Sequence, residues 1–163
     1  MSRQVPKSVA GKVAKDVRVG IVAARFNAKV VDALLEGCLK KLRKLGVGGK
    51  RVEVERVPGA FEIPLVAKAM ARTRKFGAVI CLGAVIRGET PHFELVAGEC
   101  ARGVAEVSRE EMLPVIFAVL TTNNEEQAWD RCGGKHGHVG EQAAEAAVEM
   151  MGVMGRILGN DER

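Results

Sequence analysis

The sequence predicts an α/β protein, a three-layer α/β/α sandwich in which a parallel sheet of four strands lies between two layers of helices. Three observations support this fold class. Apolar runs of strand length alternate with longer stretches of helical period, which is typical of β–α–β units. The 163 residues are 47% hydrophobic and 28% charged, which suits one domain with a sizeable core. The most unusual polar residues directly follow the predicted strands, at the sheet edge where ligands bind.

The first half of the chain contains two strands, each followed by a helix. The run VRVGIVAA predicts a strand over residues 17–24, and Asn27 is expected to cap the helix that follows it and stops at Gly46. The run RVEVERV predicts the second strand, residues 51–57. A Pro-Gly turn then leads into the second helix, FEIPLVAKAMARTR.

The second half repeats this alternation. The run AVICLGAVI predicts the third strand, residues 78–86, and Thr90 with Pro91 opens the third helix. The run LPVIFAVLT predicts the fourth strand, residues 113–121. A short helix over NEEQAWDR, a glycine-rich link and a last helix over residues 140–157 complete the domain.

The expected organisation is an N-terminal arm over residues 1–16, one domain over 17–158 and a short tail over 159–163. The arm is basic, has no acidic residue before Asp16 and lacks the apolar segment of a secretory signal. We expect it to order against a neighbouring subunit, and a short organelle-targeting stretch is the alternative. No later run approaches the length that spans a membrane, so we expect no membrane partner.

The charge distribution indicates the kind of partner, and the cysteines indicate the cellular compartment. The net charge is +5, from 25 Lys and Arg against 20 Asp and Glu, and the excess is scattered along the chain. This distribution favours an anionic small molecule over a nucleic acid. The cysteines have no paired spacing, so we interpret them as reduced residues, mostly in the core, of a cytoplasmic protein. They are Cys38, Cys81, Cys100 and Cys132.

The segment GETPH places a histidine at the predicted start of the third helix. Thr90 is the expected N-cap, Pro91 the first helical residue and His92 the second. The backbone N–H groups of such a turn point outward from the positive helix end and form an anion site, which Gly88 allows a ligand to approach closely. His92 is therefore a candidate for proton transfer, and an ordinary surface histidine is the alternative.

Two further residues follow predicted strands, and each has both a structural and a ligand-binding interpretation. Glu62 comes just after a Pro-Gly turn, where a carboxylate either caps the helix or accepts hydrogen bonds from substrate hydroxyl or amine groups. Phe26 follows the first strand directly, where it either packs in the core or offers a flat platform to a heteroaromatic ring.

The glycine-rich segment DRCGGKHGHVG, residues 130–140, indicates a loop whose backbone closely approaches another group. Arg131 is a candidate for a forked contact with a phosphate. A metal site at Cys132, His136 and His138 is the alternative, although the spacing matches no standard zinc pattern. The sequence contains no dinucleotide fingerprint, P-loop or nucleophile elbow, so the usual nucleotide and hydrolase functions lose their main support.

Five motifs together resemble the 6,7-dimethyl-8-ribityllumazine synthase family: ARFN, VPGAFEIP, LGAVIRGETPHFE, PVIFAVLTTNNEEQA and DRCGGKHG. The resemblance covers about residues 17–158 in the family's order and spacing. It implies a flavodoxin-like sheet and the penultimate step of riboflavin biosynthesis. In that step 5-amino-6-(D-ribitylamino)uracil condenses with 3,4-dihydroxy-2-butanone 4-phosphate, releasing phosphate and water, without a metal or an organic cofactor.

The resemblance also implies how the ring substrate is bound. Phe26 of ARFN would stack on the pyrimidine, while Ala60 and Glu62 of GAFE would meet the uracil and the ribityl chain. Three further residues would line the ring through their backbone: Ala84, Val85 and Ile86.

For the phosphate substrate, the resemblance implies that Glu89 and Thr90 present the phosphate site and that His92 transfers protons. Phe117 and Arg131 would come from the adjacent subunit, closing the ring pocket and holding the phosphate.

The chain departs from the family pattern at one point. Many members have a second lysine shortly before the glycine that starts the last helix, whereas this chain has Val139 there, preceded by His138. That phosphate contact is then either missing or replaced, and the candidates for secondary contacts are Lys135, His136 and His138.

The resemblance implies a pentamer with active sites between adjacent subunits, and the compact GGKHGHVG link favours an icosahedral shell of pentamers. An N-terminal arm can add a strand to a neighbouring subunit, and riboflavin synthase is a candidate functional partner or cargo. The alternatives are a non-catalytic lumazine or flavin carrier on the same fold and a shell protein that only encloses cargo. Retention of His92, Arg131 and the GETPH turn argues against the carrier.

Overall fold

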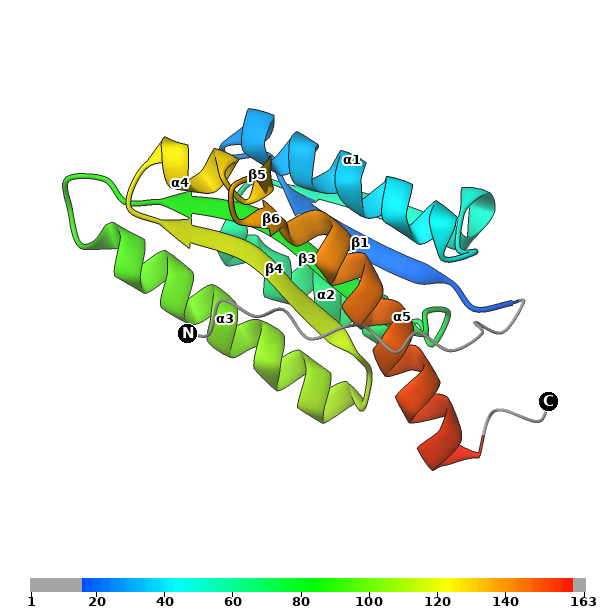
Figure 1. Ribbon diagram of the computed structural model, residues 1–163. Coiled ribbons are helices and arrows are strands. Elements are labelled where there is room, and N and C mark those ends of the chain that lie inside the picture. The colour runs from blue at the N-terminus through cyan, green and yellow to red at the C-terminus, as the bar shows by residue number, and fades with distance from the viewer. Residues whose placement is uncertain (1–15, 160–163) are drawn as a thin grey trace.

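A parallel four-stranded sheet forms the middle layer of the computed structural model, which describes residues 16–159 (Figure 1). The strand order is β2-β1-β3-β4. The strands are β1 (Val19–Ala24), β2 (Val52–Val57), β3 (Ala78–Ile86) and β4 (Val115–Thr122). The predicted parallel sheet is confirmed, with boundaries within about two residues of those expected. Most of the predicted N-terminal arm, and any strand that it adds to a neighbour, lies outside the described residues.

The strand sequences follow from where each strand lies in the sheet. β1 and β3 are central, and their VGIVAA and AVICLGAVI runs are almost wholly buried because helices cover both faces. β2 is an edge strand, and its VEVERV run keeps charged residues that are half-buried or exposed. β1 pairs with β2 from Val19↔Val52 to Ala24↔Val57, so these two strands end together.

Two pairs of helices cover the sheet, one pair on each face (Figure 1). Helices α1 (Ala28–Lys44) and α5 (Val139–Leu158) pack on one face, and α2 (Ile63–Arg72) and α3 (His92–Glu111) pack on the other. Alternate β1 side chains serve the two layers, since Ile21 joins the first core and Val22 the second. No helix within residues 16–159 is both long and apolar enough to cross a membrane.

Two predicted helix starts are wrong in detail. Helix α3 begins at His92 with Pro91 as its N-cap, one residue later than predicted, so Thr90 belongs to the preceding loop. Asn27 does occupy the N-cap position of α1, but its left-handed backbone (φ 57°) takes its side chain away from the first turn, and it makes no capping bond. A side-chain cap does form at α4 (Glu125–Trp129), where Asn124 accepts from the Gln127 N–H.

The glycine-rich link contains regular structure that its composition did not predict. Strands β5 (Cys132–Gly134) and β6 (Gly137–His138) form a small antiparallel ribbon between α4 and α5. Gly133 and Gly137 have φ values of 102° and 78°, which side chains other than glycine rarely adopt. Strands of two or three residues are too short to show an alternation of apolar and polar side chains, so the sequence could not predict this ribbon.

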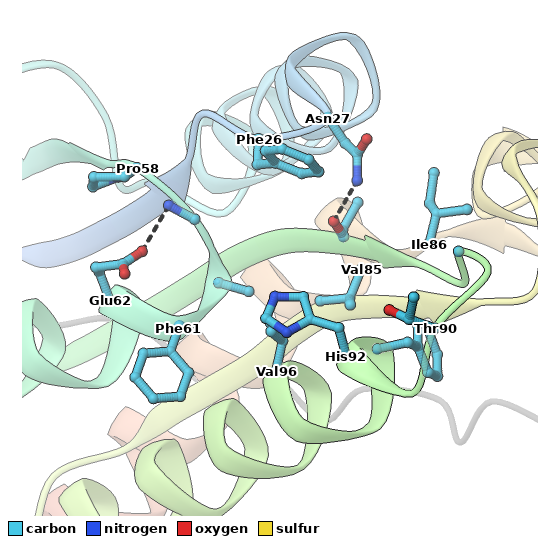
Figure 2. A pocket seen from close by; sticks show the side chains of 15 residues that line it. Phe26, Asn27, Pro58, Phe61, Glu62, Val85, Ile86, Thr90, His92 and Val96 are labelled. Carbon is cyan, nitrogen blue, oxygen red and sulfur yellow. Dashed lines mark hydrogen bonds between the residues drawn. The ribbon is translucent and has the colours of Figure 1, made fainter.

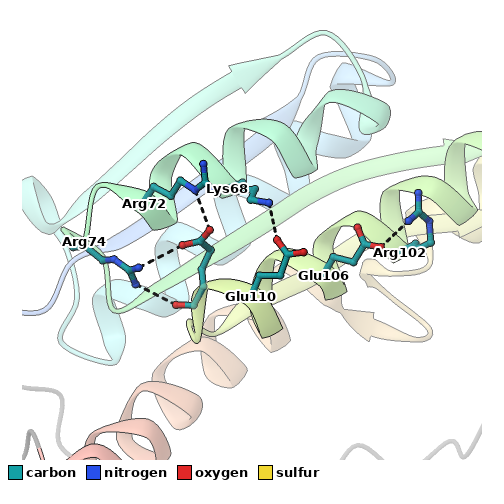
Figure 3. Close-up of polar contacts among 7 residues, drawn as sticks. Lys68, Arg72, Arg74, Arg102, Glu106 and Glu110 are labelled. Atoms are coloured by element: carbon teal, nitrogen blue, oxygen red, sulfur yellow. Dashed lines mark hydrogen bonds and ion pairs between the residues drawn. The ribbon is translucent and has the colours of Figure 1, made fainter.

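Ion pairs join the outer surfaces of α2 and α3 (Figure 3). Lys68 on α2 meets Glu110 on α3 at 2.6 Å. Arg72 Nε donates to Glu111 Oε1 at 3.0 Å, and Arg74 Nη2 lies 3.5 Å from Glu111 Oε2. The Glu111 side chain is only 8% exposed, whereas that of Glu110 is 55% exposed. These neighbouring carboxylates therefore differ both in burial and in their cationic partners, since Glu111 meets two arginines and Glu110 meets one lysine.

Replacing Glu111 by alanine should destabilise the protein by about 1.5 to 3 kcal/mol, because a buried charge-assisted hydrogen bond is lost. Glu110→Ala removes an exposed pair one residue away and should have a smaller effect, since solvent screens such pairs. Urea unfolding of both variants at equal protein concentration measures the difference. Equal losses in the two variants would show that neither the burial of Glu111 nor its second arginine adds stability.

Candidate active site

A cavity of about 580 Å³ opens at the carboxyl ends of β1, β2 and β3, the edge where parallel sheets bind ligands (Figure 2). Its wall is mostly apolar and includes only a few polar side chains. The β1 end, the turn after β2, the β3 end and the start of α3 contribute the lining residues, which are Phe26, Asn27, Pro58, Gly59, Ala60, Phe61, Glu62, Ala84, Val85, Ile86, Gly88, Thr90, His92, Phe93 and Val96.

Phe26 lies in the cavity wall with its side chain open to a ligand. The residue is 72% exposed, which rules out the core-packing alternative in the described chain. Its backbone is nevertheless fixed, because the Arg25 N–H donates to Val57 O at 2.8 Å and the Phe26 N–H donates to Pro58 O at 3.0 Å. An exposed aromatic ring that projects from a fixed backbone beside an apolar wall is suited to stacking on a flat heteroaromatic ring.

Glu62 combines the two roles that the sequence left open. Its Oε2 accepts the Gly59 N–H at 2.9 Å, so the carboxylate caps the short helix η2 (Ala60–Glu62) (Figure 2). The same side chain lines the cavity. A carboxylate has two oxygens, and engagement of Oε2 by the backbone leaves Oε1 able to accept from a ligand. The cap thus holds the group in place.

His92 is the first residue of α3, and Figure 2 shows its imidazole extending into the middle of the cavity. Val96, one turn further along the helix, lines the cavity on the same side. The first backbone N–H groups of a helix lack intrahelical partners and favour an anion nearby. The structure therefore places an imidazole beside a helix end of anion-binding character.

Arg87 holds the loop that carries Gly88, Thr90 and His92. Its backbone N–H donates to Thr122 O at 2.9 Å, and its Nε donates to Asn123 Oδ1 at 3.0 Å. The guanidinium also pairs with Glu94 and lies 4.4 Å from the centre of the Phe93 ring. The hydrogen bond from Arg87 lowers the pKa of Glu94. One side chain thus connects the end of β3, the start of α3 and the loop after β4.

The family model of 6,7-dimethyl-8-ribityllumazine synthase matches residues 16–155 of the chain. The protein belongs to this family. Family membership makes it a lumazine synthase, a transferase enzyme of a kind that acts on small molecules and assembles into homo-oligomers. The resemblance drawn from the five sequence motifs is confirmed, as is the flavodoxin-like arrangement of the sheet.

The structure brings together most of the residues that the sequence assigned to the lumazine synthase site. Those that line the cavity are Phe26, Ala60, Glu62, Ala84, Val85, Ile86, Thr90 and His92. Their convergence follows from topology, because the ends of parallel strands meet at one edge of the sheet. Glu89 is exposed on the same loop as Thr90 but is not among the residues that form the wall.

Phe117 and Arg131 lie outside the cavity of their own chain. Phe117 is on the edge strand β4 and is 41% exposed. Arg131 follows α4, where its Nη1 donates to Gln127 O at 2.8 Å. Both residues are therefore placed where they contribute nothing to the cavity formed by the same subunit.

Sequence reasoning missed several residues of the cavity wall. Phe61 lies between Ala60 and Glu62, which the motifs did identify. Val96 lies four residues after His92 and so on the same helix face, which is a signal that could have identified it. Asn27 gave no such signal, since its local pattern predicted a helix cap. The residues of the cavity wall that the sequence analysis left without a role in ligand binding are Asn27, Pro58, Gly59, Phe61, Phe93 and Val96.

The candidate secondary contacts on the β5–β6 ribbon are arranged differently from one another. His138 turns its ring toward α1, where a Cβ added to Gly37 would meet the ring at 2.1 Å. His136 Nδ1 lies 3.7 Å from Asp130 Oδ2, and Lys135 is exposed. None of these three residues lines the cavity of its own lumazine synthase subunit.

The cysteines Cys38, Cys81 and Cys100 are free and buried, as predicted. Burial raises the pKa of the Cys38 and Cys100 thiols to about 12 and also raises that of Cys81, so these thiols stay protonated and unreactive. Cys132 is half-buried, with its Sγ 3.8 Å from Val30 O. Within residues 16–159 no three His, Cys, Asp or Glu side chains are grouped so as to hold a metal ion, which leaves the metal-site alternative without support.

Proposed function

We propose that the protein condenses 5-amino-6-(D-ribitylamino)uracil with 3,4-dihydroxy-2-butanone 4-phosphate to give 6,7-dimethyl-8-ribityllumazine, phosphate and water, without a metal or organic cofactor. One observation carries the proposal. An exposed Phe26 ring, the Glu62 carboxylate and His92 at a helix start all line one cavity at the carboxyl edge of the sheet. This combination suits a ring with a polyol chain on one side and a phosphate ester on the other.

The ring substrate occupies the part of the cavity between Phe26 and the end of β3. Phe26 stacks on the pyrimidine, and the backbone of residues 84–86 lies along the edge of the ring. Ala60 and Glu62 face the ribityl chain, where a carboxylate oxygen accepts hydrogen bonds from hydroxyl groups.

The phosphate substrate occupies the start of α3. Gly88, Glu89 and Thr90 form the loop that presents backbone N–H groups to the phosphate, and His92 transfers protons between the reacting groups. The ring amine attacks the ketone carbon and expels water to form an imine. Loss of the proton from the adjacent hydroxyl-bearing carbon then expels phosphate and leaves an enol, which tautomerises to a ketone. The second amine attacks this ketone and closes the ring with loss of a second water. Because each step moves protons between two bound reactants, most of the rate enhancement comes from proximity and orientation.

The cation that faces the phosphate comes from a neighbouring subunit. Among residues 16–159, no lysine or arginine lines the cavity, although a phosphate ester is best held by a forked cation. Arg131 and Phe117 lie outside their own subunit's cavity and are available to the adjacent one. The secondary candidates on the ribbon, Lys135 and His136, are exposed and are available in the same way.

We extend the proposal to assembly and location. The active unit is a pentamer with sites between adjacent subunits, and the short β5–β6 link is compatible with an icosahedral shell of pentamers. The domain spans residues 17–158 between an N-terminal arm and a short tail. The protein works in the cytoplasm, without nucleic acid or membrane partners, with riboflavin synthase as its functional partner or cargo.

The test is incubation of the purified protein with both substrates while lumazine fluorescence and phosphate release are followed together. We expect equal amounts of the two products. His92→Ala should slow the reaction by roughly 10²-fold without abolishing it, because positioning survives when the proton carrier is lost. Lys50→Ala is the control and should retain full activity, because Lys50 lies just before β2 and so at the amino ends of the strands, away from the cavity at their carboxyl ends. Binding of the ring compound without turnover would instead identify a carrier.

A further inference from the structure

Asn27 has two unusual features at the mouth of the cavity. Its backbone is left-handed, with φ 57° and ψ 44°, a conformation that few residues other than glycine adopt. Its side chain does not cap α1 despite its N-cap position. Instead, Nδ2 donates a hydrogen bond of 2.8 Å to Ala84 O, across 57 positions of the sequence (Figure 2).

This bond forms where the sheet loses a strand. Pairing of β1 with β3 ends at Ala23↔Leu82, whereas β3 continues to pair with β4 as far as Ile86↔Thr122. The last residues of β3 therefore lie beyond the end of their β1 partner, and a backbone carbonyl there needs another donor. The Asn27 amide supplies one to Ala84. It extends the contact between the two chain segments past the end of the ladder.

Phe26 precedes Asn27 in the same loop and bonds a different strand end. The Phe26 N–H donates to Pro58 O, so the loop is joined to the segment after β2 by its backbone and to β3 by the Asn27 side chain. We propose that Asn27 is a positioning residue that fixes the Phe26 ring relative to the β3 end, so that both surfaces meet one flat ligand ring. This inference rests on the proposed function, since the ligand ring is the aminouracil.

Position 27 requires a residue that tolerates a left-handed backbone and also has a side-chain donor for the Ala84 carbonyl. Asparagine meets both requirements. Glycine tolerates the left-handed backbone but has no donor. Aspartate tolerates this backbone and has the same shape, but it presents an acceptor to the Ala84 carbonyl. Alanine meets neither requirement. Replacement of Asn27 by each of these residues therefore separates the backbone conformation from the hydrogen bond.

The experiment measures both Michaelis constants, kcat and thermal unfolding for wild type, Asn27→Gly, Asn27→Asp and Asn27→Ala. We expect Asn27→Gly to raise KM for the ribitylaminouracil by about 3- to 10-fold, as loss of one hydrogen bond implies. KM for the phosphate substrate and the unfolding temperature should stay close to wild type. Asn27→Asp should raise KM for the ring substrate further. Asn27→Asp and Asn27→Ala should also unfold at a lower temperature, the first because its carboxylate faces the Ala84 carbonyl and the second because alanine strains the left-handed backbone.

The outcomes separate this inference from the proposed function. A wild-type protein that forms no lumazine overturns the proposed function and this inference with it. An active wild type with an unchanged Asn27→Gly variant overturns the positioning role alone. A rise in both Michaelis constants together with a lower unfolding temperature in Asn27→Gly also overturns it, because that pattern marks a general structural role.

Discussion

Replacing Gly140 by alanine should lower the free energy of unfolding by about 3 kcal/mol or more. Gly140 lies in the first turn of α5, where the helix meets α1. A Cβ at this position would lie 2.0 Å from Leu34 O and 2.9 Å from Leu34 C. These are backbone atoms within α1, so no side-chain rotation can relieve the overlap and the two helices have to move apart.

Gly152→Ala is the matched control, since Gly152 lies on the same helix but no backbone atom of another element lies close to its added Cβ. Its added Cβ would have Arg156 Nη1 as nearest atom, at 3.6 Å, which is an ordinary contact. Alanine favours a helix over glycine, so this variant should be as stable as wild type or slightly more stable. Urea unfolding at a fixed protein concentration compares the three proteins. A Gly140→Ala variant within about 1 kcal/mol of wild type would contradict the expectation.

Arg131→Ala should raise KM for the phosphate substrate by about 10- to 100-fold, as loss of a charge-assisted contact worth ~1.5 to 3 kcal/mol implies. If Arg131 serves the adjacent subunit, mixing this variant with His92→Ala has a second consequence. Some interfaces of a mixed assembly combine an intact His92 with an intact Arg131, while others lack both. Co-assembled mixtures should therefore regain activity that neither variant shows alone.

The two variants are unfolded and refolded together and also separately, and mass measurement confirms the mixed assemblies. Rates are compared at a concentration of phosphate substrate well below the KM of Arg131→Ala. A co-refolded sample that only matches the average of the separate samples means that both residues serve one subunit's pocket or that one has no role. The position of Arg131 outside its own cavity favours recovery.

Much of the site could be predicted from short motifs because a parallel sheet has a simple geometry. ARFN, VPGAFE and GETPH each follow a predicted strand, and the ends of parallel strands meet at one edge. Phe26, Glu62 and His92 consequently line one cavity, although 66 positions separate the first from the last. The sequence could not decide between stacking and core packing for Phe26, since exposure depends on what the rest of the chain covers.

The sequence by itself determined the four strands of the main sheet, the approximate positions of the helices and the family, because apolar periodicity and motif spacing are local properties of the chain. Only the tertiary structure decided which partner each polar side chain takes. The Asn27 side chain donates a hydrogen bond to Ala84 O and does not cap helix α1, and the Arg87 side chain bonds both Asn123 and Glu94. The physical reason is that a hydrogen bond requires a partner at about 3 Å, and residues distant in sequence reach that separation only after the sheet and its helices have packed.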